Sequence, residues 1–141
     1  MDVSTAATEN PLPATKALLS FPFYQISYEN PVSYLGYLFF LEFVPTMAGR
    51  GMIKELRAIG VPENAFSFLH DHTTVDVGHN KAMERYCDQL VQTDADRDDV
   101  VYAIQATSYL YAQMLKQAVE RSGQIGSLGR AHLERPLHSV T

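Results

Sequence analysis

Apolar residues recur at helical spacing through most of the chain, from about residue 14 to residue 121. Positions three and four apart carry large apolar side chains together, which is the pattern of a helix with a buried face. No segment sustains the alternation of apolar and polar residues that a half-buried strand shows. The pattern therefore predicts an all-α protein, and it contains no internal repeat.

The strongest predicted helix begins near Pro31 and is apolar on nearly every side through VSYLGYLFFLEF. Pro45 and the Gly-Arg-Gly sequence that follows it are expected to interrupt this helix. A shorter helix, MIKELRAI, should then end at Gly60. Upstream, residues 14–28 contain Pro22, so they predict only a short helical turn followed by a connector.

Two further helices are expected in the second half of the chain. One runs over residues 63–91, bent or broken once, because Gly78 and three β-branched residues weaken it. The other covers residues 98–121 after the acidic cap TDADRDD, and Gly123 ends it. These elements predict three regions, which are a disordered lead-in over 1–13, a helical bundle domain over 14–122 and a flexible tail over 123–141.

Length and composition limit the classes of function. A chain of 141 residues with 46% hydrophobic and 19% charged residues is one small globular domain. Its formal charge is −5 and its 11 Lys and Arg residues form no basic stripe, so we expect no nucleic-acid partner. The N-terminus lacks a secretory signal, and no apolar run approaches a membrane span of about 18 residues, so we expect a cytoplasmic protein without membrane association. Cys87, the single cysteine, excludes an internal disulfide.

His72, Asp76 and His79 form a candidate metal-binding stripe. At about 100° per residue, positions i, i+4 and i+7 differ by only about 40° and 20° around a helix, so the three side chains share one face. Imidazole nitrogen and carboxylate oxygen together suit iron, manganese or zinc. The same spacing would also arise from a buried histidine pair satisfied by Asp76, or from a solvated polar face.

Glu42 is a second candidate ligand, because it lies in YLFFLEFV on a helix almost free of charge. An ionised carboxylate in an apolar setting costs several kcal/mol unless a metal or cation compensates it. Carboxylate and histidine sites of this kind are assembled between facing helices of bundles. Alternatively, Glu42 lies on a solvated stripe of its helix or pairs with Arg50 or Arg57.

Two motifs of this chain resemble one family. The segment YLGYLFFLEFVPTMAG, followed about thirty residues later by FLHDHTTVDVGHNKAM, is similar to the heme-oxygenase-like di-iron oxidases and oxygenases, also called iron-containing redox enzymes. In that family a glutamate ends Y-L-G-x5-E and a later helix carries H-x3-D-x2-H, which match Glu42 and the stripe of His72, Asp76 and His79. The resemblance covers roughly residues 30–121.

The resemblance implies a heme-oxygenase-like helical bundle in which three histidines and three carboxylates hold two iron ions that activate O2. The family's remaining glutamate and histidine come from a helix upstream of the first motif. Here only 33 residues precede that motif, with no histidine and with Glu9 and Glu29 as the only glutamates. We therefore expect a bundle that is shortened at its N-terminus or is the C-terminal portion of a longer one. Either a second chain supplies the missing helix, or the site holds one ion or none.

The function expected from the resemblance is an iron-dependent oxidase or oxygenase that uses O2 on a small organic substrate such as a fatty acid, an amino acid or an amine. Alternatives are a metal-free enzyme like thiaminase II or pyrroloquinoline-quinone synthase, or a non-catalytic helical interaction module. The expected partners besides substrate are a second copy or a companion chain, bound across the apolar Tyr34–Val44 face. Candidate substrate-lining residues are Leu38, Phe39, Tyr102, Ala106 and Tyr109.

Overall fold

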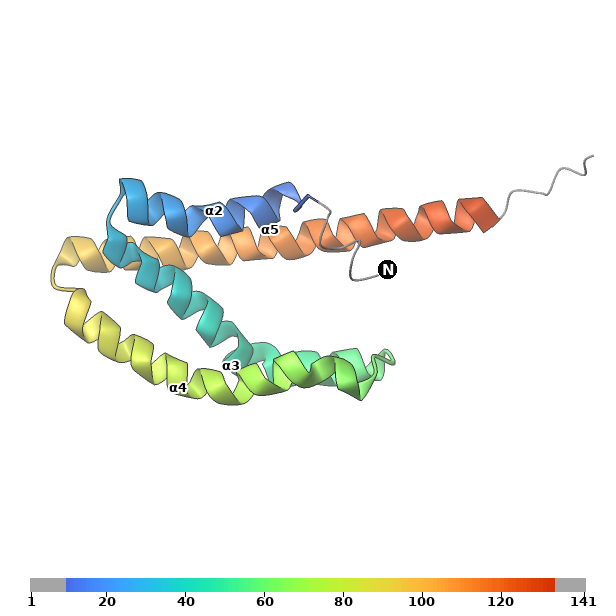
Figure 1. Ribbon diagram of the computed structural model, residues 1–141, viewed down its shortest axis with the longest axis horizontal. Helices are drawn as coiled ribbons and strands as arrows, with labels where there is room; N and C mark the ends of the chain where they lie inside the picture. The colour runs from blue at the N-terminus through green and yellow to red at the C-terminus, as the bar shows by residue number, and fades with distance from the viewer. Residues whose placement is uncertain (1–9, 134–141) are drawn as a thin grey trace, which may run out of the picture. The chain divides into compact units, whose positions relative to one another are not determined.

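The computed structural model describes residues 10–133, except for the side chains of Thr74 and of residues 124–133. It contains helices and no strand within that range, so the predicted all-α class is confirmed (Figure 1). Residues 1–9 of the predicted lead-in and residues 134–141 of the predicted tail lie outside the described residues, whereas residues 123–133 are helical. The elements are α2 (Pro13–Tyr28), η1 (Pro31–Ser33), α3 (Tyr34–Ala58), η2 (Glu63–Phe66), α4 (Ser67–Leu90) and α5 (Asp94–Leu133).

The chain divides into two compact units. Unit 1 comprises residues 1–19 and 109–141, and unit 2 comprises residues 20–108. Within unit 1 the first turn of α2 is tied to α5, because the Ala14 amide donates a hydrogen bond to the Gln117 side chain at 2.9 Å. Every residue of the candidate metal site lies in unit 2.

The expectation of a short turn and a connector over residues 14–28 is wrong, since α2 is a continuous helix of 16 residues with Pro22 inside it. Proline removes one backbone hydrogen bond and crowds the preceding turn. Helices in proteins draw most of their stability from tertiary packing. Here Leu18, Pro22 and Gln25 are buried on one side of α2, so packing offsets the local penalty.

The predicted break after Pro45 is also wrong. A single helix of 25 residues, α3, continues through Pro45 and the two following glycines to Ala58. Figure 1 shows α3 changing direction part-way along its length, as expected where proline interrupts the backbone hydrogen bonds. The Thr46 hydroxyl donates to the Phe43 carbonyl at 2.8 Å in this turn.

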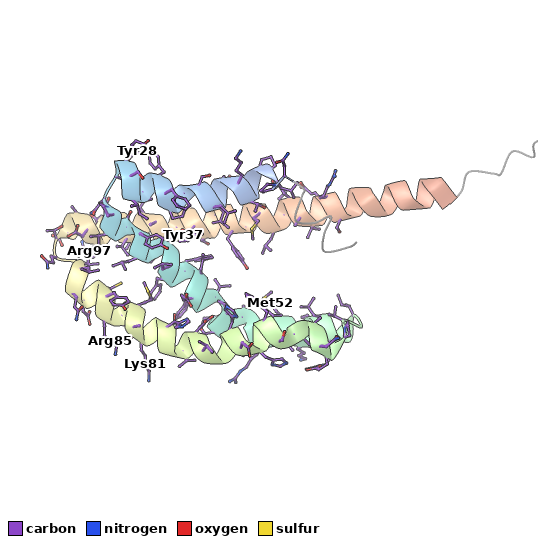
Figure 2. All side chains as sticks on the ribbon, viewed as in Figure 1. Tyr28, Tyr37, Met52, Lys81, Arg85 and Arg97 are labelled. Carbon is purple, nitrogen blue, oxygen red and sulfur yellow. The ribbon has the colours of Figure 1, made fainter. Side chains whose placement is uncertain are left out.

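Helices α3 and α4 form an antiparallel hairpin and lie side by side (Figure 1). Their approach is close at Gly49, where an added Cβ would stand 2.5 Å from the Thr73 methyl group. Gly60 has a positive φ of 87° and ends α3, as its position in the sequence predicts. Arg57 and Glu63 pair at 2.7 Å across the turn. Lys81 and Arg85 project from the side of α4 that faces away from α3 (Figure 2).

Leu35, Met83 and Val100 form the core where α3, α4 and α5 meet in unit 2. Gly36 permits this contact, because a Cβ there would lie 2.3 Å from the Val100 carbonyl oxygen. The core fixes one end of the α3–α4 hairpin, and therefore fixes where Glu42 lies two turns further along α3.

Thr93 and Asp96 cap the start of α5. The Asp96 amide donates to the Thr93 hydroxyl at 3.1 Å, and the Thr93 amide donates to the Asp96 carboxylate at 3.0 Å. This reciprocal pair is a cap of the kind expected from the sequence, but the expected helix start at residue 98 is wrong, because α5 begins at Asp94 within the acidic segment. The expected end of the helix at Gly123 is wrong, because α5 extends to Leu133. A glycine inside a helix weakens it by only about 1 kcal/mol, which the neighbouring turns can absorb.

The segment Pro31–Ala58 is 28 residues long and is apolar enough, by length and composition, to cross a membrane. This differs from the sequence-based expectation, because apolar residues continue through Pro45 on one helix. Core helices of soluble proteins meet the same two criteria.

Candidate metal centre

Glu42 projects from the face of α3 that packs on α4. Leu35, Gly49 and Ile53 are buried on this face, and helical spacing places Glu42 between them. The Glu42 side chain is 30% exposed, so it is partly desolvated rather than free in water. A carboxylate in this position needs a compensating charge.

Asp76 and His79 lie on the opposing face of α4, which packs on α3. Asp76 is almost fully buried, with 1% of its surface exposed. His79 Nδ1 lies 2.8 Å from Glu42 Oε2 and 3.2 Å from Asp76 Oδ1, so one imidazole nitrogen bridges the two carboxylates. Glu42 does not pair with Arg57, which was one of its two alternative partners in the sequence, because Arg57 pairs with Glu63.

One potential ligand atom from each of Glu42, Asp76 and His79 lies within 4.8 Å of the other two. Ligands bound to one ion at about 2.1 Å stand at most about 4.2 Å apart, so a small side-chain movement would close the group around a cation. Among the side chains that the structure describes, this is the one group of three or more potential His, Cys, Asp or Glu ligands. The cluster therefore has the size and composition of a metal site.

The charges within the cluster also favour a cation. Burial, and then the charge of Glu42, raise the pKa of the Asp76 carboxyl above its ordinary value. The hydrogen bond to Glu42, and then the charge of Glu42, raise the pKa of the His79 imidazole. Asp76 Oδ2 is buried without a hydrogen-bond partner. A buried acceptor without a partner destabilises the folded protein, and a bound divalent ion would supply the missing partner.

His72, the remaining residue of the predicted stripe, is not part of this group. Its Nδ1 donates to the Phe68 carbonyl oxygen at 2.8 Å, and its ring packs on the Phe68 ring with the centroids 3.9 Å apart. Because Nδ1 donates to this carbonyl, Nε2 is the ring nitrogen of His72 that would be left to bind an ion. Histidines that bind metals commonly donate their other N–H to a carbonyl in this manner. Its role as a ligand stays a prediction.

Asn80 and Thr46 adjoin the cluster, although no sequence motif pointed to either residue. Asn80 lies one helical turn after Asp76, and Thr46 one turn after Glu42, so both pairs share a face. The Asn80 Nδ2 donates to Thr46 Oγ1 at 3.2 Å, which links the two helices beside the carboxylates. The i, i+4 spacing of Asn80 from Asp76 could have indicated that Asn80 lies beside the cluster, but amide side chains are not among the usual candidates for metal ligands.

An apolar groove of about 190 Å³ follows the adjacent face of α3. Of the five residues predicted to line a substrate site, Phe39 lines this groove, whereas Leu38 packs against the core. Tyr102 lines a different hollow, and Tyr109 belongs to unit 1, so a common substrate site for the five stays a prediction. Ala106 is half-buried on α5. The groove is lined by Phe39, Phe40, Phe43, Val44, Met47, Ala48 and Ile104.

Comparison with known families gives one match. The sequence model described as "Iron-containing redox enzyme" matches residues 1–112 of the 141, a span that includes Glu42 and the stripe on α4. The match starts upstream of the two motifs and ends within α5. No curated protein and no solved structure matches the chain. The helical, heme-oxygenase-like fold expected from the motifs is thereby confirmed, and the chain belongs to the family of iron-containing redox enzymes.

Proposed function

We propose that this protein is an iron-dependent oxidase or oxygenase that uses O2 on a small organic substrate such as a fatty acid, an amino acid or an amine. The convergence of Glu42, Asp76 and His79 within 4.8 Å, in a member of an iron-containing redox family, is the observation that carries the proposal. Glu42 comes from α3, whereas Asp76 and His79 are neighbours on α4, more than thirty residues later in the sequence. Only the packing of α3 on α4 brings them together.

The three residues would each contribute a different kind of ligand to an ion. Glu42 and Asp76 supply two negative charges that balance a divalent cation, and His79 supplies a neutral nitrogen. Asp76 binds from the buried side, while the 52% exposed side chain of His79 leaves that side of the site open to incoming molecules. Fe(II) held there would supply electrons for the reduction of O2.

The groove on α3 is a candidate place for the apolar part of a substrate. Phe39 and Phe43 stack with their centroids 5.4 Å apart and precede and follow Glu42 on the helix. At about 100° per residue they lie roughly 60° and 100° around α3 from Glu42. An apolar chain seated on these rings would therefore lie beside the carboxylate without displacing it. We propose two iron ions as the resemblance implies, with His72 as a further ligand.

The test is iron binding by the purified chain. Protein freed of metal is incubated with Fe(II) under nitrogen, passed through a desalting column and assayed for iron per chain. We expect at least one ion per chain in the wild type, and less than one tenth of that in a Glu42→Gln, His79→Gln double variant.

His70→Gln is the matched control, because His70 lies on the same helix but pairs with Glu63 outside the cluster. It should retain the wild-type iron content. Wild-type protein that is folded but holds no iron would overturn the proposal. Oxygen uptake by the iron-loaded protein is then measured after addition of fatty acids, amino acids or amines, to identify the class of substrate.

A further inference from the structure

Asn80 lies at the level of Glu42 in the α3–α4 hairpin. Gly49 on α3 stands against Thr73 on α4. In an antiparallel pair, moving seven residues back from Gly49 reaches Glu42, and moving seven residues on from Thr73 reaches Asn80. Asn80 also follows Asp76 by one turn, so both side chains occupy the face of α4 that packs on α3.

The hydrogen bonds around Thr46 fix which way the Asn80 amide points. The single hydroxyl proton of Thr46 is donated to the Phe43 carbonyl. Thr46 Oγ1 can therefore only accept from Asn80, and the atom that approaches it at 3.2 Å must be Nδ2. The opposite orientation would place two oxygens without a proton between them. Oδ1 of Asn80 is consequently the atom that stays buried without a partner.

Two acceptor atoms are thus left unsatisfied on one face of α4. Asp76 Oδ2 and Asn80 Oδ1 are the buried side-chain atoms without a hydrogen-bond partner among the residues described. A buried acceptor without a donor destabilises the fold, and native proteins rarely keep such atoms without a reason. A cation satisfies both oxygens at once, whereas a single donor hydrogen satisfies one.

We infer that Asn80, through Oδ1, is a fourth ligand of the ion held by Glu42, Asp76 and His79. This inference rests on the proposed function, because it requires the ion. Two carboxylates, a neutral amide oxygen and a neutral imidazole balance the charge of a divalent cation, whereas a third carboxylate would leave excess negative charge. Three oxygens and one nitrogen suit Fe(II) and Mn(II), and no thiolate is present to favour a softer metal.

The test measures Mn(II) affinity, because Mn(II) is stable in air and its free form is counted by electron paramagnetic resonance. Asn80→Ala should raise the dissociation constant at least about 10-fold, the lower end of the loss seen when groups around a metal are removed. Asn80→Leu, which keeps most of the side-chain volume, should lose affinity equally. Asn80→Asp retains an oxygen at the same position and should bind within about threefold of the wild type or more tightly.

Gln89→Ala is the matched control, since it removes an exposed amide from the same helix away from the cluster. Circular dichroism without metal establishes that each variant is helical, and Asn80→Leu covers the case in which Asn80→Ala fails to fold. Wild-type affinity in both Asn80→Ala and Asn80→Leu overturns the inference. Equal losses in Asn80→Asp also overturn it, because they indicate that the hydrogen bond from Nδ2 to Thr46, and not Oδ1, supports the site. Absence of Mn(II) and Fe(II) binding in the wild type overturns the proposed function itself.

Discussion

Asp76 lies buried beside Glu42 and His79, and one of its oxygens has no partner. We predict that Asp76→Asn leaves the metal-free melting temperature unchanged or raises it, because the substitution removes a buried negative charge next to Glu42. The same variant should lose most of the stabilisation by Mn(II). Thermal unfolding with and without Mn(II) measures both effects. A residue of purely structural importance would instead lower the metal-free melting temperature.

Gly49 allows α3 to approach α4 at the level of Thr73. Gly49→Ala should destabilise the protein by about 1–3 kcal/mol, since the new methyl group overlaps the Thr73 methyl. Adding Thr73→Ser removes that methyl and should restore part of the loss, as measured by urea unfolding.

Gly51 provides the control for this prediction, because nothing lies within 4 Å of an added Cβ there. Gly51→Ala should stabilise α3 by about 0.5–1 kcal/mol. If the substitutions at 49 and 51 had equal effects, the close approach of the two helices would not be the cause.

At the scale of elements, the cap of α5 predicts a dependence of stability on pH. Hydrogen bonds from Asn30 and then from Thr93 lower the pKa of Asp96. A carboxyl whose pKa is lower in the folded state contributes stability above its unfolded pKa of about 3.9, and that contribution disappears as the pH falls through the folded value.

We therefore predict that Asp96→Asn destabilises the protein at pH 7 and that the difference from wild type shrinks below about pH 4. Thr93→Ala should cost about 1 kcal/mol at pH 7. Urea unfolding across this pH range measures both, with the exposed Asp88→Asn as the control. If the difference in stability between the wild type and Asp96→Asn stayed constant with pH, the role of the Asp96 charge would be contradicted.

At the scale of the whole molecule, metal binding should stabilise the fold. Fe(II) or Mn(II) at 100 times its dissociation constant adds about 2.7 kcal/mol by linkage, which corresponds to roughly 5–10 °C in melting temperature. Differential scanning calorimetry under nitrogen measures the shift, and a chelator should reverse it. The Glu42→Gln, His79→Gln double variant should show no shift.

The apolar groove on α3 predicts self-association. Met47 is 71% exposed and Phe43 is 40% exposed, and contiguous apolar surface of this kind usually marks an interface. We expect a dimer by light scattering and a shift toward monomer in Met47→Asp. A wild-type monomer at all concentrations would contradict this, and partition of the chain into lipid vesicles would instead indicate that α3 enters a membrane.

The helical class and three of the residues that meet could be predicted from the amino-acid sequence. Apolar periodicity is a local property, and the spacing of Asp76 and His79 on one helix follows from helix geometry alone. Glu42 was identified because a carboxylate in an apolar helix needs a partner. The start of α5 was likewise readable, because a cap is built from neighbouring residues.

The ends of the helices and the set of side chains that come together depend on packing between helices. Pro22 and Pro45 weaken helices locally, yet α2 and α3 continue through them because packing outweighs propensity. His72 has the right spacing, but its Nδ1 bonds to a carbonyl one turn earlier, and spacing alone does not determine a rotamer. Asn80 donates a hydrogen bond to Thr46 on the other helix, beside the cluster. Contacts between distant segments depend on how the whole chain packs, so no local pattern in the sequence specifies them.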